Sequence, residues 1–297
     1  MALERVKTSI LLMLIPTLVC LAASLYISAR DGGHDIEAQE INAFGMSYYA
    51  VFKNSHFCIF DGEFKKLLEY RTGGETVVIS RCISDLDDDE ADEILLLTGN
   101  SGSEYASDLL ILKIRSNGMD TDRESYEAAQ SISLDLIYKK DMTDLKPWKV
   151  QTCDVDGDGK TEISIGVYKT AIFHPVMAKR PFIYEWHGNA ISPKWLGSRL
   201  ARPFDDYIFS DINNDGIDEL ISIEHLGDGR KAVNSYTWKG FGFDGTGGSD
   251  AFDDILSIKR IMSEDGTEYV EADVVDNGEQ KRIILHFSGS RLEQAAL

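Results

Sequence analysis

The sequence predicts an all-β protein, and three observations lead to this fold class. Apolar and polar residues alternate over short segments such as 163–167 and 220–223, which is the period of two expected for strands. An Asp-rich segment occurs three times, at 85–94, 154–163 and 211–220, each time between two such strands. No segment has a long helical period. The pattern therefore predicts a repeated unit of strand, acidic loop and strand.

Glycine-containing turns between apolar segments predict further hairpins, because Gly beside Asn or Asp readily adopts the positive φ of a tight turn. These hairpins lie at residues 57–70, 109–123, 182–191, 236–243 and 283–292. A degenerate fourth acidic loop, 263–268, keeps an Asp-Gly turn. Units of about 50 residues with four short strands are typical of β-propeller blades. We therefore expect a β-propeller of about five four-stranded blades, with a two-sheet β-sandwich as the alternative.

The N-terminal region reads as a targeting or anchoring segment. Residues 1–7 contain Arg5 and Lys7, and residues 8–28 carry no charge, which is long enough to cross a bilayer. A cleaved signal peptide is the alternative. Residues 29–44 are expected to be a linker and residues 45–297 the propeller domain. The expected location is the cell membrane, with a single span and the domain extracytoplasmic, or secretion after signal cleavage.

The composition restricts the partners. With 30 basic and 50 acidic side chains the net charge is -20, which argues against nucleic acid, because phosphate binding needs clustered Lys and Arg. The same charge fits a protein that binds cations. Outside the apolar segment, the thiols are Cys58, Cys82 and Cys153, so at most one intramolecular disulfide can form. Their apolar neighbours favour buried, unreactive cysteines.

The acidic loops have the chemistry of calcium sites. Oxygen ligands at alternate positions of a tight loop converge on one point, and a hard cation takes six to eight oxygens. We expect side chains at positions one, three, five and nine and the carbonyl of position seven to coordinate Ca²⁺. The predicted ligands are Asp154, Asp156, Asp158, Lys160 and Glu162; Asp211, Asn213, Asp215, Ile217 and Glu219; and, as a third possible site, Asp85, Asp87, Asp89, Ala91 and Glu93.

Two other interpretations of the loops are weaker. An EF-hand needs a bidentate Glu at position twelve and flanking helices, whereas position twelve is Leu96, Ile165 or Ser222. Asp and Gly also occur in ordinary turns, but three gapless copies with Glu at position nine favour a metal site. The loop at Asp85 differs from the others, because Glu90 replaces the turn glycine. That loop is therefore either a cation site or a solvated acidic turn.

The loops, written D-[ILV]-[DN]-x-D-G-x-x-E-[IL], resemble the FG-GAP (VCBS) repeats of integrin α-subunit propellers and of many exported bacterial proteins. The resemblance covers roughly residues 45–293, although the Phe-Gly and Gly-Ala-Pro tags of the family are not clearly present. It implies a β-propeller in which calcium is structural and other loops on the propeller face recognise ligands. It also implies an adhesive or interaction role.

No catalytic motif occurs: G-x-S-x-G, HExxH and a glycine-rich phosphate loop are all missing. We therefore expect a non-enzymatic module that binds a protein or a polysaccharide at the cell surface. The alternative is a calcium-dependent carbohydrate-active enzyme, a polysaccharide lyase or hydrolase, on the same scaffold. A basic and apolar segment, 168–181, stands out in the acidic chain. The expected ligand-binding patch combines residues of this segment with nearby tryptophans: His174, Lys179, Arg180, Trp186 and Trp195, together with Arg199.

Overall fold

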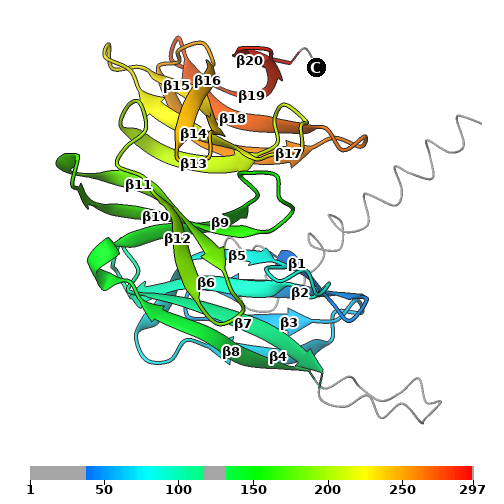
Figure 1. Ribbon diagram of the computed structural model, residues 1–297. Helices are drawn as coiled ribbons and strands as arrows, with labels where there is room; N and C mark the ends of the chain where they lie inside the picture. Colours follow the sequence, from blue (N-terminus) through cyan, green and yellow to red (C-terminus); the bar gives the residue numbers. More distant parts are fainter. Residues whose placement is uncertain (1–37, 117–131, 296–297) are drawn as a thin grey trace, which may run out of the picture. The chain divides into compact units, whose positions relative to one another are not determined.

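The computed structural model describes residues 38–116 and 132–295 (Figure 1). The predicted cytoplasmic segment 1–7, the apolar segment 8–28 and most of the linker lie outside these residues. Within the described part, no helix has the length and apolarity needed to cross a membrane. The first strand begins at Ala38, ahead of residue 45, because Ile41 and Ala43 of the polar-looking segment 38–43 are buried and pair with the next strand.

The predicted all-β class is confirmed. The described residues form twenty strands in five four-stranded sheets, and their only helix is the short 3-10 turn η1 (Thr143–Leu145). Sheet 1 consists of β1 (Ala38–Ala43), β2 (Met46–Lys53), β3 (His56–Phe60) and β4 (Lys66–Arg71). Sheet 2 consists of β5 (Thr76–Ser84), β6 (Glu93–Asn100), β7 (Asp108–Ser116) and β8 (Ile132–Asp141).

The remaining three sheets follow in chain order. Sheet 3 consists of β9 (Pro147–Cys153), β10 (Glu162–Ala171), β11 (His174–Trp186) and β12 (Ile191–Leu196). Sheet 4 consists of β13 (Phe204–Ser210), β14 (Glu219–His225), β15 (Lys231–Trp238) and β16 (Phe243–Gly248). Sheet 5 consists of β17 (Asp254–Met262), β18 (Glu268–Asp276), β19 (Glu279–Ser288) and β20 (Arg291–Gln294).

Every sheet is a meander in which each strand pairs with the next strand along the chain. The predicted hairpins at 57–70, 182–191, 236–243 and 283–292 are confirmed as β3–β4, β11–β12, β15–β16 and β19–β20. The turn and the second strand of the predicted hairpin 109–123 lie outside the described residues. Its first strand belongs to β7, which pairs antiparallel with β8, a strand beyond the predicted bounds. Cys58, Cys82 and Cys153 are free thiols.

The chain divides into two compact units, with the boundary inside β9. The first unit comprises Met1–Val150 and Gly188–Ala190, and the second comprises Gln151–His187 and Ile191–Leu297. In the first unit, sheets 1 and 2 share an apolar core that includes Ile41, Phe57, Ile94 and Leu112. In the second unit, sheets 4 and 5 share a core that includes Ile221 and Val270. Burial of these apolar faces is the main stabilising contribution to each unit.

A recurring carboxylate joins neighbouring sheets within each unit. In the first unit, Asp92 Oδ2 accepts a hydrogen bond of 2.6 Å from the backbone N–H of Asn42, and the Asp92 N–H donates to the Asn42 carbonyl at 2.8 Å. In the second unit, Asp218 Oδ2 accepts from the Asp154 N–H at 2.9 Å, and the Asp218 N–H donates to the Asp154 carbonyl at 2.8 Å. We call this carboxylate–backbone pairing the inter-sheet clamp.

Sheets 4 and 5 carry the same clamp with a longer side chain. Glu268 Oε2 accepts from the Asp211 N–H at 2.9 Å and from the Ser210 hydroxyl at 2.8 Å. When the loops are aligned, Asp92, Asp218 and Glu268 all stand at position eight, immediately before the predicted ligand position nine. In the loop of sheet 3 this position is Thr161, which has no carboxylate. The carboxylates at position eight therefore bond the neighbouring sheet and do not contribute to their own loop.

Asp218→Ala should weaken the packing of sheet 4 on sheet 3. The substitution leaves the Asp154 N–H without its carboxylate acceptor, so we expect the free energy of unfolding to fall by about 1.5–3 kcal/mol. Urea unfolding of the two chains measures the difference. Glu264→Ala, at an exposed position of the β17–β18 turn, is the control and should change stability by no more than about 0.5 kcal/mol. Equal effects of the two substitutions would contradict the clamp.

Candidate functional site

The three acidic loops occupy the same place in their sheets. Each connects the first strand to the second: β5 to β6, β9 to β10, and β13 to β14. The second strand begins in each case at the position-nine glutamate, which is Glu93, Glu162 or Glu219. These three glutamates are at most 2% exposed. The predicted order of strand, loop and strand is therefore confirmed, with one carboxylate per loop buried in its sheet.

The loops also share a pattern of internal hydrogen bonds. The position-one aspartate accepts the backbone N–H of position six, at 2.8 Å for Asp85, 2.9 Å for Asp154 and 2.9 Å for Asp211. The position-five carboxylate accepts the N–H of position seven in all three loops, at 2.9–3.1 Å. These bonds hold the backbone in a tight turn. The aspartates at positions one and five therefore fold the loop, whatever else they bind.

Position six needs a left-handed backbone. Gly159 and Gly216 have φ of 79° and 84°, and Glu90 adopts φ of 64° at the same place. A residue with a Cβ pays a steric penalty in this region, so Glu90 places local strain in the loop of sheet 2. The replacement of glycine by glutamate nevertheless leaves the turn intact.

Two of the loops bring acidic oxygens close enough to hold a metal ion. In Asp85, Asp87 and Glu93, and in Asp154, Asp156 and Glu162, one carboxylate oxygen from each residue lies within 4.8 Å of the others. The residues are therefore compatible with a hard cation such as calcium. Among the described residues, the loop of Asp211 forms no such group of three acids, because position three is the amide Asn213. The donor set of that loop mixes carboxylates with one amide oxygen.

A lysine lies among the carboxylates of each of these two groups. Lys113 Nζ on β7 is 3.0 Å from Asp87, 2.8 Å from Asp89 and 2.6 Å from Glu93. Lys194 Nζ on β12 is 2.5 Å from both Asp156 and Glu162. The side chains of Lys113 and Lys194 are 6% and 11% exposed. An ammonium group therefore already neutralises part of each acidic cluster, and a metal ion would compete with it.

The protonation of these lysines follows from their surroundings. Burial alone would lower the pKa of the Lys194 ammonium, but hydrogen bonds to Asp156 and Glu162 outweigh it and raise that pKa. The pKa of Lys113 is raised in the same way by Asp89, Glu93 and Asp87. Both lysines are therefore charged at neutral pH. The carboxylates of these two loops have a permanent internal counter-ion.

The third loop lacks this compensation. Glu219 Oε1 accepts from Asn213 Nδ2 at 2.9 Å and from Thr237 Oγ1 at 3.2 Å, whereas Oε2 is buried without a hydrogen-bond partner. Burial, followed by the charge of Asp215, raises the pKa of Glu219 to about 7. A buried carboxylate oxygen without a donor is costly. The loop at Asp211 therefore fits an added cation through its uncompensated charge.

The predicted ligand patch does not come together as one surface. His174 and Trp186 lie at opposite ends of β11. Arg180 is fully buried and donates from Nε and Nη2 to the carbonyls of Lys169, His174 and Val176 at 2.8–3.0 Å. The remaining residues are turned toward neighbouring groups: Lys179 Nζ bonds the Asp205 carbonyl at 2.5 Å, and Trp195 packs on Trp238 and Phe243 with ring centroids 6.3 Å and 5.0 Å apart.

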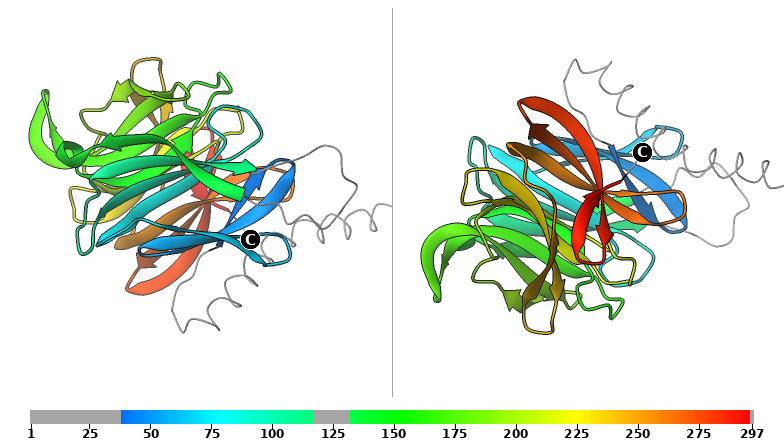
Figure 2. Two further views of the ribbon diagram at one scale, coloured as in Figure 1. Left: turned by 90° about the horizontal axis from the view of Figure 1, so that it is seen from below. Right: turned by 90° about the horizontal axis from the view of Figure 1, so that it is seen from above.

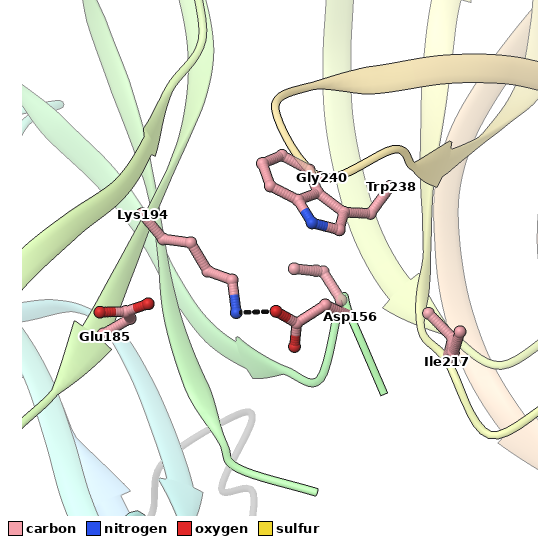
Figure 3. Close-up of a pocket in the computed structure, with 7 residues that line it drawn as sticks. Asp156, Glu185, Lys194, Ile217, Trp238 and Gly240 are labelled. Carbon is pink, nitrogen blue, oxygen red and sulfur yellow. Dashed lines mark ion pairs between the residues drawn. The ribbon is translucent and has the colours of Figure 1, made fainter. Parts of the chain in front are cut away.

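A groove of about 520 Å³ lies between sheets 3 and 4 of the second unit. Its lining comes from the acidic loops of sheets 3 and 4, from strands β11 and β12, and from the end of β15 with the turn that follows it. The lining residues are Val155, Asp156, Glu185, Lys194, Ile217, Trp238 and Gly240. Figure 3 shows the Trp238 ring above Asp156, with the Lys194 ammonium turned toward that carboxylate. The floor is closely packed, because a Cβ on Gly157 would lie 2.8 Å from Ile217 Cγ1. Position four of the sheet 3 loop therefore has to be small.

Sequence reasoning missed Lys113, Lys194 and Trp238. A charged residue inside the apolar run Ile111-Leu112-Lys113-Ile114 was a usable signal, since buried lysines need an acidic partner.

Comparisons with models of known protein families and with curated protein sequences find no match to this chain. The resemblance to FG-GAP repeats accordingly stays a prediction.

Lys194→Met should make the loop of sheet 3 dependent on calcium. The substitution keeps the length of the side chain but leaves Asp156 and Glu162 without their counter-ion, so the free energy of unfolding in chelator should fall by about 3–5 kcal/mol. Calcium should restore part of this loss by binding the folded state. Urea unfolding with calcium or chelator measures both effects.

The matched control is Lys160→Met in the same loop. Among the described residues, Lys160 forms an ion pair with Asp158 alone, at 3.0 Å, and its side chain is 78% exposed, so its loss should leave stability almost unchanged, because exposed ion pairs contribute little. Similar losses for the two lysines, or no calcium response in Lys194→Met, would contradict the role given to Lys194.

Glu219 should make stability depend on pH when divalent cations are removed. Its folded-state pKa of about 7 lies above the ordinary value of 4.5, so its contribution is fully present below about pH 4.5 and is lost as pH rises through 7. The total loss is at most about 3 kcal/mol. Unfolding in chelator between these pH values measures the slope, which Glu219→Gln should flatten. A slope that is unchanged in Glu219→Gln would contradict this assignment.

Proposed function

We propose that this protein is a binding module that holds a neutral or amine-bearing saccharide in the groove between sheets 3 and 4. One observation carries the proposal: an indole ring, two carboxylates and an ammonium group border one open groove of about 520 Å³. This volume falls within the range of small-molecule sites, which combine aromatic surface with a few polar groups. The partner is thus a polysaccharide rather than a protein.

The groove offers the two kinds of contact that a sugar needs. The face of Trp238 provides a flat apolar surface on which the C–H face of a pyranose ring can stack, and an indole combines large area with low conformational entropy. Glu185, whose side chain is 46% exposed, provides a carboxylate that accepts hydroxyl hydrogen bonds. Asp156, 33% exposed, adds a second acceptor beside the ring. These groups favour a ligand that donates hydrogen bonds.

The charge of the groove restricts the saccharide further. Asp156 and Glu185 face the groove, and the one lysine is already shared between Asp156 and Glu162 at 2.5 Å each. The groove is therefore acidic and would repel uronate chains, while an amino sugar gains an ion pair. This charge also argues against a lyase that uses Lys194 as its proton-abstracting base, because the raised pKa keeps that lysine protonated.

The scaffold we propose is a β-propeller of five blades built from FG-GAP-like repeats. Five successive four-stranded meanders and three acidic loops in the same connection support this assignment. Calcium is the proposed cation, with a structural role: it would neutralise Glu219 in the loop of sheet 4, whose Ile217 lines the groove. The proposed location is outside the cytoplasm, with residues 8–28 as the membrane segment or signal.

Trp238→Ala should weaken saccharide binding strongly. The substitution removes the stacking surface but leaves both carboxylates in place, so we expect affinity to fall by at least about tenfold, corresponding to about 1.4 kcal/mol. Affinity electrophoresis in gels containing a neutral polysaccharide, an amino-sugar polymer or a uronate polymer measures the binding.

Phe173→Ala is the control, because Phe173 is 91% exposed at the far end of the β10–β11 hairpin. We expect retardation of the parent chain and of this control by the first two polymers and none by the uronate. Retardation by the uronate alone, or equal retardation of Trp238→Ala and the parent chain, would sink the proposal.

A further inference from the structure

The β10–β11 hairpin is longer than its sheet requires. β11 has 13 residues and β10 has 10, whereas the outer strands of sheet 3, β12 and β9, have 6 and 7. β10 and β11 pair from Glu162↔Glu185 out to Ala171↔His174, while β12 pairs with β11 only over Phe182–Trp186. Figure 2 shows this hairpin, in bright green, curving out past the other strands of its sheet. We call residues 168–181 the arm.

The end of the arm is apolar and exposed. Ile172 and Phe173, adjacent at the turn, are 92% and 91% exposed, and Val176 and Met177 behind them are 57% and 39% exposed. Single exposed hydrophobic residues are common, but four on one short hairpin mark an interaction surface. The two residues at the turn project furthest and meet a partner first.

The arm is held in shape from within. Arg180, which is fully buried, donates to the carbonyls of Lys169, His174 and Val176 at 2.8, 3.0 and 2.8 Å. A hydrogen bond from a charged donor is roughly twice as strong as one between neutral groups. The Lys169 carbonyl belongs to β10, and the other two carbonyls belong to β11. The apolar end is therefore presented by an ordered support, which lowers the entropic cost of binding.

The charge of the arm differs from that of the rest of the chain. Residues 168–181 contain Lys169, Lys179 and Arg180 and no Asp or Glu, in a protein of net charge -20. Arg180 is buried and the Lys179 ammonium bonds the Asp205 carbonyl at 2.5 Å, whereas Lys169 is partly exposed and lies behind the apolar end. An apolar tip followed by a cation is complementary to a bilayer surface with anionic headgroups, since acyl chains accept the tip and phosphates attract the lysine.

We propose that the arm inserts Ile172 and Phe173 into an anionic lipid surface while Lys169 faces the headgroups. The argument depends on the exposure and charge of the arm, and it is separate from the saccharide groove. The uncharged segment 8–28 gives the chain a second point of contact with the same bilayer. The arm then orients the protein on the membrane instead of anchoring it.

The test is a depth measurement on the full chain carrying Phe173→Trp. The chain is mixed with vesicles of phosphatidylcholine, or of phosphatidylcholine and phosphatidylserine in equal parts, with bromine on the acyl chains as a quencher of tryptophan emission. Phe241→Trp is the matched control, because Phe241 is 85% exposed and lies at the turn of another hairpin, β15–β16. The signal of the parent chain, which has 4 tryptophans, is subtracted from both.

We expect the added fluorescence of Phe173→Trp to be quenched at least about twofold more than that of Phe241→Trp on anionic vesicles, and less on phosphatidylcholine alone because Lys169 loses its anionic partner. Adding Lys169→Gln should reduce the quenching on anionic vesicles. Equal quenching at the two positions would overturn insertion of the arm, and a preference for phosphatidylcholine would overturn its anionic specificity. A Phe173→Trp chain that instead bound another protein without quenching would also count against the lipid surface.

Discussion

The fold depends on placing a carboxylate at the buried start of a strand. Glu93, Glu162 and Glu219 begin the second strand of their sheets with almost no exposure. Taking such a charge out of water is costly unless hydrogen bonds or an opposite charge replace the lost hydration. Backbone donors of the preceding loop supply part of the replacement: Leu86 bonds Glu93 at 2.9 Å and Val155 bonds Glu162 at 3.1 Å. The tight form of these loops thus places backbone N–H groups where the buried carboxylate can accept them.

The same requirement links the loops to the groove and to the packing of sheets. Lys194 neutralises Glu162 and, through the same ammonium group, fixes Asp156 at the edge of the groove. One residue before Glu93 and Glu219, the side chain turns away from its own loop and bonds the neighbouring sheet, as Asp92 and Asp218 do. Two adjacent positions therefore have different roles. The glutamate at position nine needs charge compensation inside its repeat, and the carboxylate at position eight bonds the neighbouring repeat. The groove is lined by the loops of sheets 3 and 4, where both kinds of contact occur.

The sequence predicted the strands, the loops and their spacing well, because these depend on local periodicity and on turn chemistry. It predicted the counter-ions poorly, because Lys113 and Lys194 come from the third and fourth strands and only sheet formation brings them to the loops. Arg180 illustrates the same difficulty: its basic segment resembled a ligand patch, but the bend of the arm turns the guanidinium onto its own carbonyls. Trp238 is part of the groove only because folding brings the end of β15 next to the loops of sheets 3 and 4.

The lysines also change how the repeats respond to their surroundings. A loop whose positive charge is covalently part of the chain keeps its counter-ion whatever the ionic composition of the medium. The loop at Glu219 has no such charge, so its sheet alone would register the loss of divalent ions or a change in acidity. Of the three acidic loops, the one at Glu219 is therefore the loop that would respond to divalent ions and to pH, and its Ile217 lines the groove.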